Sequence, residues 1–223
     1  MKHLLSVLLV GLLLFMSGCG NDEEPRLRAL HASPDTGGID IFVEDDEIIS
    51  DLNFRDSSDY EDVETGQQRV RVRESGGDTL EEFDVNFPDD TDLTAIVTGF
   101  RGDPDVILLT DDTSEPPSGQ ARIRAVHSAP NAGPVDVYVT QPGADLNTAT
   151  PQIVALSYTN FSQYLQVQEG TYQIRVTSTG FKDIVIDSGP VQLDSRQVRT
   201  AVAVNPPQGA AGPFGLVVLT DRD

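Results

Sequence analysis

The sequence predicts an all-β protein built from two tandem β-sandwich domains. Short segments rich in Val, Ile, Thr, Tyr and Phe recur along the chain, and Gly, Pro, Asn or Asp separate them. Apolar and polar residues alternate within these segments, as in residues 171–177, where Tyr172, Ile174 and Val176 are the apolar members. No window of helical length has an apolar period of 3.6 residues. About seven such strands in roughly 90 residues favour an Ig-like or transthyretin-like sandwich.

The second domain is predicted to be an internal repeat of the first. Residues 27–34 line up with residues 123–130, and both segments carry Arg, His and Pro at the same places. The offset between the copies grows along the chain, so we expect insertions in the loops between matched strands. The further matched blocks are 37–43 with 133–139, 60–72 with 164–176, 94–97 with 200–203, and 109–111 with 219–221. The strands expected in the second copy are 122–127, 135–139, 162–167, 171–177, 184–187, 198–204 and 214–220.

The N-terminal residues have the pattern of an export signal. A basic start at Lys2 and His3 precedes an apolar run over residues 4–16, and small residues follow. This pattern is typical of a secretory signal peptide, and a run of about 13 residues is too short to span a bilayer comfortably. Residues 16–19, Met-Ser-Gly-Cys, resemble the lipobox of bacterial lipoproteins, with Met in the place of the usual Leu. The resemblance implies cleavage before Cys19 and acyl chains such as palmitate on it; the alternative is an ordinary signal peptide with an incidental Cys.

The lipoprotein resemblance also implies a location. Acyl chains on Cys19 would make the membrane a partner of the exported protein. In Gram-negative lipoproteins an Asp after the Cys favours retention in the inner membrane, so Gly20 favours the outer membrane. The segment 20–25 reaches about 20 Å when extended, which keeps the first domain close to the lipid.

These features predict the domain organisation. We expect a signal peptide (1–18), a lipidated tether (19–25), an acidic first sandwich (26–112), a linker (113–120) and a second sandwich (121–223). The linker contains Pro116 and Pro117 and is therefore a stiff polar connection. Two arrangements fit this linker: sandwiches that pack together, and sandwiches that swing independently.

Charge excludes one class of partner. The chain has 15 Lys and Arg against 36 Asp and Glu, a formal charge of −21, whereas binding of nucleic acid needs clustered cations. Residues 27–112 hold 24 acids and 6 Arg, but residues 123–223 hold 8 acids and 6 Lys and Arg. The densest acidic runs lack the D-x-D-x-D-G spacing of a calcium loop, so we interpret them as solvated surface, with calcium binding as the alternative. Only 2 of the 15 basic residues are Lys, a preference that fits a halophilic source in which salt screens self-repulsion.

The matched blocks resemble a bacterial family known as domain of unknown function 4397, found in secreted and surface-anchored proteins. Residues 124–139, 164–172 and 200–204 carry the resemblance, and the first copy departs from it at residues 64–68. The resemblance extends over nearly all of residues 26–223. It implies β-sandwich repeats at the cell surface and no established activity.

Two equivalent His–Asp pairs are the candidates for chemistry. His31 precedes Asp40, and His127 precedes Asp136, at the same places in the two copies. A His beside a carboxylate can act as a general base or as an oriented metal ligand. Each copy has one His and no second His or Cys to complete a zinc site, so we expect no cofactor. We interpret each pair as a structural hydrogen bond; binding of a metal or ligand, and a hydrolase that uses His31 or His127, are the alternatives.

Aromatic and arginine side chains supply the remaining candidates. Tyr158, Phe161 and Tyr164 cluster in the second copy, where core packing is the simplest role and a platform for polysaccharide is the alternative. The three Arg within residues 69–73 alternate along one strand, and we expect them to pair with acidic residues of the neighbouring strand.

These observations together predict a non-enzymatic, lipid-anchored protein of the cell envelope. No G-x-S-x-G, S-x-x-K or phosphate-binding glycine loop is present, which argues against an enzyme. The two sandwiches would serve binding or structural contact, with another envelope protein or a glycan as partner. Recognition of surface polysaccharide in adhesion is the alternative function.

Overall fold

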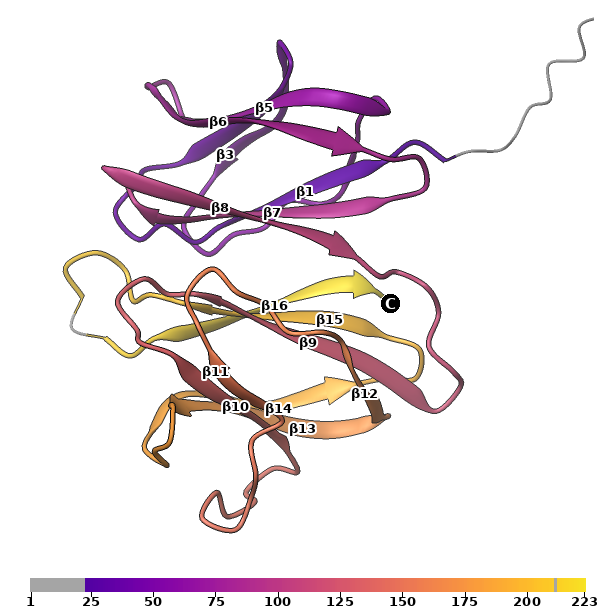
Figure 1. Ribbon diagram of the computed structural model, residues 1–223, viewed down its shortest axis with the longest axis vertical. Helices are drawn as coiled ribbons and strands as arrows, with labels where there is room; N and C mark the ends of the chain where they lie inside the picture. Colours follow the sequence, from indigo (N-terminus) through magenta and orange to yellow (C-terminus); the bar gives the residue numbers. More distant parts are fainter. Residues whose placement is uncertain (1–22, 211) are drawn as a thin grey trace, which may run out of the picture.

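The computed structural model describes residues 23–210 and 212–223, and within them all regular structure is β-strand. Sixteen strands form four sheets of four strands each, so the prediction of an all-β protein with two sandwiches is confirmed (Figure 1). Across this described part of the chain, no helix is long and apolar enough to cross a membrane. The signal peptide and Cys19 lie outside the described residues.

The first eight strands are β1 (Arg26–His31), β2 (Ile39–Val43), β3 (Asp46–Leu52), β4 (Glu61–Asp62), β5 (Gly66–Glu74), β6 (Thr79–Phe87), β7 (Asp92–Phe100) and β8 (Asp103–Asp111). The other eight are β9 (Gln120–Ser128), β10 (Val135–Thr140), β11 (Ile153–Leu156), β12 (Leu165–Gln168), β13 (Gly170–Ser178), β14 (Ile184–Leu193), β15 (Val198–Val204) and β16 (Gly215–Arg222).

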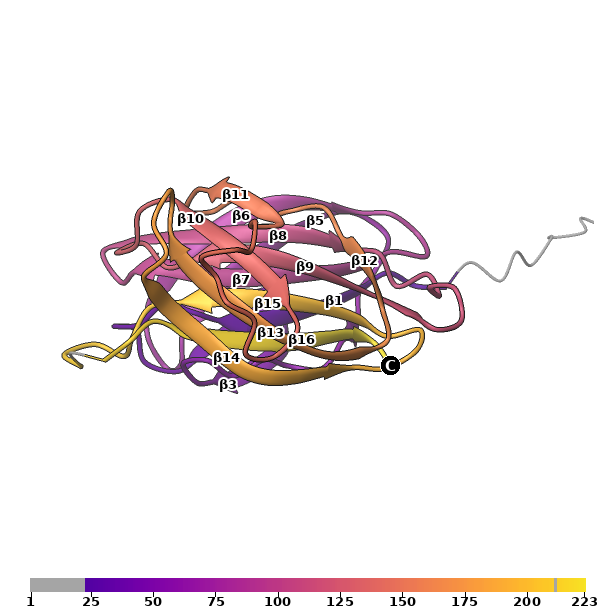
Figure 2. The ribbon, with the colours of Figure 1, turned by 90° about the horizontal axis from the view of Figure 1, so that it is seen from below.

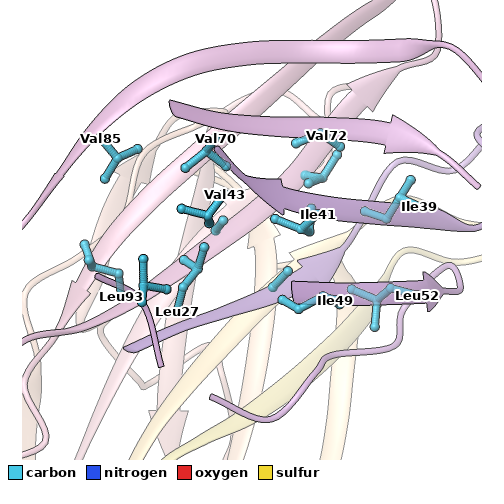
Figure 3. Packing of buried hydrophobic residues seen from close by; sticks show 14 of the residues in the cluster. Leu27, Ile39, Ile41, Val43, Ile49, Leu52, Val70, Val72, Val85 and Leu93 are labelled. Atoms are coloured by element: carbon cyan, nitrogen blue, oxygen red, sulfur yellow. The ribbon is translucent and has the colours of Figure 1, made fainter. Parts of the chain in front are cut away.

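The first sandwich consists of the sheets β4-β1-β7-β8 and β3-β2-β5-β6. In the first sheet β1 pairs with β7 in parallel, whereas neighbouring strands of the second sheet are antiparallel. Alternation along the strands builds the core between them, because Val70 and Val72 of β5 point inward and the intervening arginines point out. Figure 3 shows how the two sheets fill this core from both sides, with Leu27 of β1 facing Ile41 and Val43 of β2.

The second sandwich has the same arrangement. Its sheets are β12-β9-β15-β16 and β11-β10-β13-β14, and β9 again pairs in parallel with β15. Two details differ from the sequence-based expectation. The short strand β11 is an eighth strand that the sequence did not suggest, because Ala155 at its centre has a left-handed backbone (φ 53°) and no alternation develops. Strand β14 continues to Leu193, past Gly189 and Pro190, where its pairing with β13 shifts register.

The two sandwiches pack against each other, so the four sheets form four layers (Figures 1 and 2). The sheets that contain β1 and β9 are the two inner layers, and their central strands are buried on both faces. Strand β1 illustrates how this works, because Leu27 and Ala29 face the core of the first sandwich while Leu30 faces the second sandwich. One apolar cluster joins the sandwiches and contains Leu30, Ala32, Ile96, Ile107, Leu109, Val126, Val202, Val204 and Leu219. Of the two arrangements that the linker allows, the structure has the packed one.

The linker lies against the second sandwich. Arg222 of β16 donates from Nη1 to the carbonyl oxygen of Thr113 at 3.0 Å. Its Nη2 atom lies 3.2 Å from a carboxylate oxygen of Glu115, which Arg196 also contacts at 3.1 Å. These contacts fix the connection at one end of the stacked sheets, beside the C-terminus (Figure 1).

Candidate functional site

A buried arginine of the first sandwich reaches into the second. Arg28 lies on β1, and its side chain is only 4% exposed. Nε donates to the Thr94 hydroxyl at 2.8 Å within the same sandwich. Nη1 donates to the carbonyl oxygen of Thr220 at 2.7 Å, and Nη2 donates to the carboxylate of Asp221. The guanidinium therefore joins β1 to the last strand of the other sandwich.

The second sandwich returns the same set of contacts. Arg124 lies on β9 at the place that corresponds to Arg28, and its Nε donates to the Thr200 hydroxyl at 2.8 Å. Nη1 donates to the carbonyl oxygen of Thr110 at 3.0 Å, and Nη2 donates to the carboxylate of Asp111. Reciprocal contacts of this kind characterise two halves related by an approximate twofold axis.

Two tyrosines close this reciprocal network. The Tyr60 ring lies 4.6 Å from the guanidinium of Arg28, and its hydroxyl donates to the carboxylate of Asp111. The Tyr164 ring lies 4.7 Å from the guanidinium of Arg124, and its hydroxyl donates to Asp221 at 2.8 Å. Each carboxylate thus accepts from an arginine of the other sandwich and from a tyrosine of its own.

Burial sets the electrostatics of the network. Removal from water raises the pKa of the Tyr60 and Tyr164 hydroxyls, so both keep their protons and donate. Burial likewise raises the pKa of the Asp111 carboxyl, and the two arginines oppose that effect. For Arg28, burial lowers the pKa, but Tyr60, Asp111 and Asp221 more than offset this and raise it. The donors and acceptors of the network therefore hydrogen-bond to one another, and the network is a structural contact.

The sequence-based reasoning did not single out these four charged residues. Arg28 and Arg124 stand in the first matched block, and Asp111 and Asp221 stand in the last. The sequence held one signal of the network. Both copies have a charged residue between apolar neighbours at these places, and a charge in such a place needs a buried partner.

His31 and His127 are fully buried and close equivalent turns. Nε2 of His31 lies 2.8 Å from the carbonyl oxygen of Gly37, and the backbone N–H of Ser33 donates to Nδ1 at 3.3 Å. His127 makes the same pair of contacts, with Gly133 at 3.1 Å and Ala129 at 3.2 Å. An amide can only donate to Nδ1, so each ring is neutral with its proton on Nε2. Burial lowers the pKa of both imidazoles, in agreement with that state.

The prediction of a hydrogen bond between His and Asp is wrong in both copies. Asp40 accepts from the backbone N–H of Asp51 at 2.9 Å and from the Ser75 hydroxyl at 2.6 Å. Asp136 accepts from the backbone N–H groups of Ala155 and Gly180, both at 2.9 Å. The reason is topological. Each His lies on an inner sheet, and each Asp lies on an outer sheet, where it alternates with residues that fill the core.

The three aromatic residues of the second copy do not form a common platform. Tyr158 packs edge-on against His127, with ring centroids 6.2 Å apart, and donates to the carboxylate of Asp105 at 2.8 Å. Tyr164 belongs to the reciprocal network, as described above. Phe161 is 45% exposed, and its backbone forms an isolated bridge with Val126. Only Phe161 presents much of its ring to solvent.

A groove lies beside Phe161 where the second sandwich meets the end of β8. Its volume is about 360 Å³, within the range of small-molecule sites. Arg122 in its wall donates to the carboxylate of Asp112 and to Ser114, so that guanidinium is held in place. The residues that line it are Thr110, Asp112, Arg122, Arg124, Phe161, Ser162, Gln163, Tyr164 and Gln166.

Of the three arginines of β5, Arg69 and Arg71 contact acidic side chains, whereas Arg73 donates to the carbonyl oxygen of Gly77 at 3.0 Å. Arg69 of β5 lies 3.6 Å from Glu82 and 3.7 Å from Asp84 on β6, as the sequence suggested. Arg71 instead contacts Asp45 at 3.2 Å. Within residues 23–210 and 212–223, no group of three or more His, Cys, Asp or Glu side chains is arranged to hold a metal ion.

Comparison with known proteins gives a family and remote structural likenesses. The sequence profile described as "Domain of unknown function (DUF4397)" matches residues 25–138, which cover the first sandwich together with β9 and most of β10. Comparison with curated proteins finds no match. Among solved structures, the chain resembles an α-glucan-recognising carbohydrate-binding module of family 41 from streptococcal virulence factors. The two chains are 12% identical, the match covers 82% of this chain and 96% of that chain, and the TM-score is 0.28. A family 26 carbohydrate-binding module from Eubacterium rectale, solved with maltoheptaose, is 8% identical, with 87% and 95% covered and a TM-score of 0.27. Likenesses at this level carry no information about a ligand.

Proposed function

This chain belongs to the DUF4397 family of domains of unknown function, and we propose that it is a non-enzymatic, lipid-anchored envelope protein. It presents its two sandwiches as one rigid module for binding or structural contact. The closed contact between the sandwiches supports the rigid module, and the resemblance of residues 16–19 to a lipobox supports the anchor. Arg28 and Arg124 each bridge the two halves. The outer surfaces of the two sandwiches are therefore held at a fixed separation when a partner binds.

The histidines support a non-enzymatic role. A general base must reach the proton that it removes. His31 and His127 are both 0% exposed, and both ring nitrogens of each contact backbone groups. The hydrolase alternative therefore has no accessible imidazole among the described residues.

The anchor is tested by metabolic labelling with radioactive palmitate. We expect label on the wild-type protein and none on the Cys19→Ser variant, which should leave the membrane fraction. Label that persists in Cys19→Ser, or no label on either protein, would contradict lipidation at this residue.

The face of the membrane on which the module lies is tested by protease treatment of intact cells, with lysed cells as the control. We propose attachment to the outer membrane, because Gly20 and not Asp follows the Cys. We further propose that the sandwiches lie outside the cell, as the resemblance to a family of surface-anchored proteins implies. Loss of the mature protein on intact cells is the expected result. Protection until lysis would instead support a periplasmic role, such as contact with another envelope protein.

Recognition of a surface polysaccharide is a second candidate function. The groove beside Phe161 favours it, because this groove combines an exposed aromatic ring with polar side chains in a volume of about 360 Å³. An aromatic ring and amide groups are the side chains that can contact, respectively, the apolar face and the hydroxyls of a sugar.

A further inference from the structure

We propose that this groove, whose lining includes Arg122, Phe161, Gln163, Tyr164 and Gln166, binds an uncharged oligosaccharide. Phe161 supplies the stacking surface, and the amides of Gln163 and Gln166 supply hydrogen bonds. The inference rests on the proposed role as a binding module, and it assigns the site and the chemical class of the ligand.

The two sandwiches provide an internal comparison for this site. The backbone of Phe161 bridges to Val126, and that of Ser57 bridges to Leu30 in the first sandwich. In both copies the next residue is a Ser whose hydroxyl accepts from the backbone of the inner strand at 3.0 Å. Phe161 and Ser57 therefore occupy equivalent places in two similar folds.

The side chains around these equivalent places differ in kind. Where the second sandwich has Phe161, Gln163 and Gln166, the first has Ser57, Asp59 and Asp62. The first sandwich therefore has no ring at this position and carries carboxylates where the second has neutral amides. Because the fold is the same in both copies, it does not by itself require a ring or amides here.

The polar groups of the groove suit an uncharged ligand. The guanidinium charges of Arg122 and Arg124 are paired with the carboxylates of Asp112 and Asp111, respectively. Nε of Arg122 has no hydrogen-bond partner among the described residues. Among residues 23–210 and 212–223, the side-chain amides of Gln163 and Gln166 have no hydrogen-bond partner in the protein, and both residues are exposed. An amide both donates and accepts, as a sugar hydroxyl does. The formal charge of −21 also disfavours the approach of an anionic polymer.

The walls of the groove are already in place. Tyr164 is fixed by its hydrogen bond to Asp221 and by the guanidinium of Arg124, which lies 4.7 Å from its ring centre. Arg122 is held by Asp112 and Ser114. Because Tyr164 and Arg122 are held before binding, these two walls lose little conformational entropy when the ligand arrives.

Glycan binding by the purified full-length protein tests the proposal. The probes are neutral glucan, mannan, galactan and chitin oligosaccharides, with hyaluronate and alginate oligosaccharides as anionic probes. We expect binding to at least one neutral probe and none to the anionic probes. Phe161→Ser should weaken binding about tenfold or more, since it removes the stacking surface, and Gln166→Asp should weaken it as well.

Two features keep this test decisive. Phe161→Ser introduces the residue that the first sandwich already has at this place, so the variant is expected to fold cooperatively, which thermal unfolding checks. Phe181→Ser removes a ring that is 63% exposed and does not line the groove, and it should bind as the wild type does. Binding to no neutral probe, or equal binding by Phe161→Ser and the wild type, would overturn the proposal. Palmitate labelling and protease treatment report on the anchored module independently, so the two proposals can fail separately.

Discussion

Arg28 donates to the carboxylate of Asp221 across 193 residues of sequence, from the first strand of one sandwich to the last strand of the other. Both side chains are almost completely buried. A charge buried at this depth is tolerated because its partner and its hydrogen bonds are in place. The stability of each sandwich therefore depends on its contact with the other.

We expect Asp221→Asn to destabilise the protein by about 3–5 kcal/mol, since Arg28 and Arg124 would then share the single carboxylate of Asp111 and one buried positive charge would be uncompensated. Chemical denaturation of the full-length protein measures this change. Arg69→Ala is the control, because Arg69 is 55% exposed and pairs with exposed acids, and removal of such a pair costs about 1 kcal/mol or less. Equal effects of the two substitutions would mean that the buried network contributes little.

The sandwiches should stay together when the linker is cut. A protease site inserted between Pro117 and Ser118, both exposed, allows cleavage after folding. We expect the two fragments to elute together in size-exclusion chromatography, because the apolar cluster and both arginines hold them. Leu109→Ala should weaken this association, since it creates a cavity in the shared cluster at a cost of about 2–5 kcal/mol. Separate elution of fragments from the otherwise unchanged protein would contradict the rigid module.

Stability should fall as the pH drops below about 6.5, and the two histidines should contribute to the fall. Burial lowers the pKa of His31 and His127 below the ordinary 6.5. Between each lowered value and 6.5 the unfolded state binds a proton that the folded state does not, so acid favours unfolding. Each imidazole contributes up to about 1.4 kcal/mol per pH unit in that window.

The free energy of unfolding, measured from pH 7.5 to 5, checks this expectation. The doubly substituted His31→Gln, His127→Gln protein should show a flatter dependence than the wild type. An unchanged slope would mean that other groups account for the acid sensitivity.

The hairpin between β7 and β8 should tolerate a methyl group at one glycine and reject it at another. Gly99 has a φ of 78°, and a Cβ there would lie 2.5 Å from the carbonyl oxygen of Asp103. Gly99→Ala should therefore cost more than the about 1–2 kcal/mol of the left-handed backbone alone. At Gly102 a Cβ would meet nothing within 4 Å beyond its chain neighbours, so Gly102→Ala is the matched control in the same hairpin. Thermal unfolding of the two variants distinguishes them, and similar midpoints would contradict the tight turn.

Salt should stabilise the protein. Between residues 27 and 112 the chain holds 24 acids and 6 Arg, so its first sandwich repels itself at low ionic strength. In 1 M salt the screening length falls to about 3 Å, which removes most of the repulsion between exposed carboxylates. We expect a higher unfolding midpoint in 1 M potassium chloride than in dilute buffer. Equal midpoints would argue against adaptation to a saline environment.

Alternation along strands made much of the fold predictable. The alternation of the three Arg within residues 69–73 correctly indicated the outward face of β5, and the short β-rich segments correctly indicated two sandwiches. The near-continuous apolar run of β7 indicates a strand buried on both faces, but it does not indicate which surface covers the outward face, so the contact between the inner sheets was not predictable. The prediction that His31 pairs with Asp40 was wrong for a topological reason. Residues close in sequence were assigned to neighbouring strands, whereas the chain crosses to the other sheet between them.

The reciprocal network has a consequence for how the pairing depends on protein concentration. Each contact face carries one arginine and one aspartate, so it complements a face of its own kind. Two unlinked sandwiches with such faces would pair by mass action and separate on dilution. A short linker replaces that dependence with an effective concentration on the order of millimolar. The pair therefore persists however few copies of the protein a cell contains.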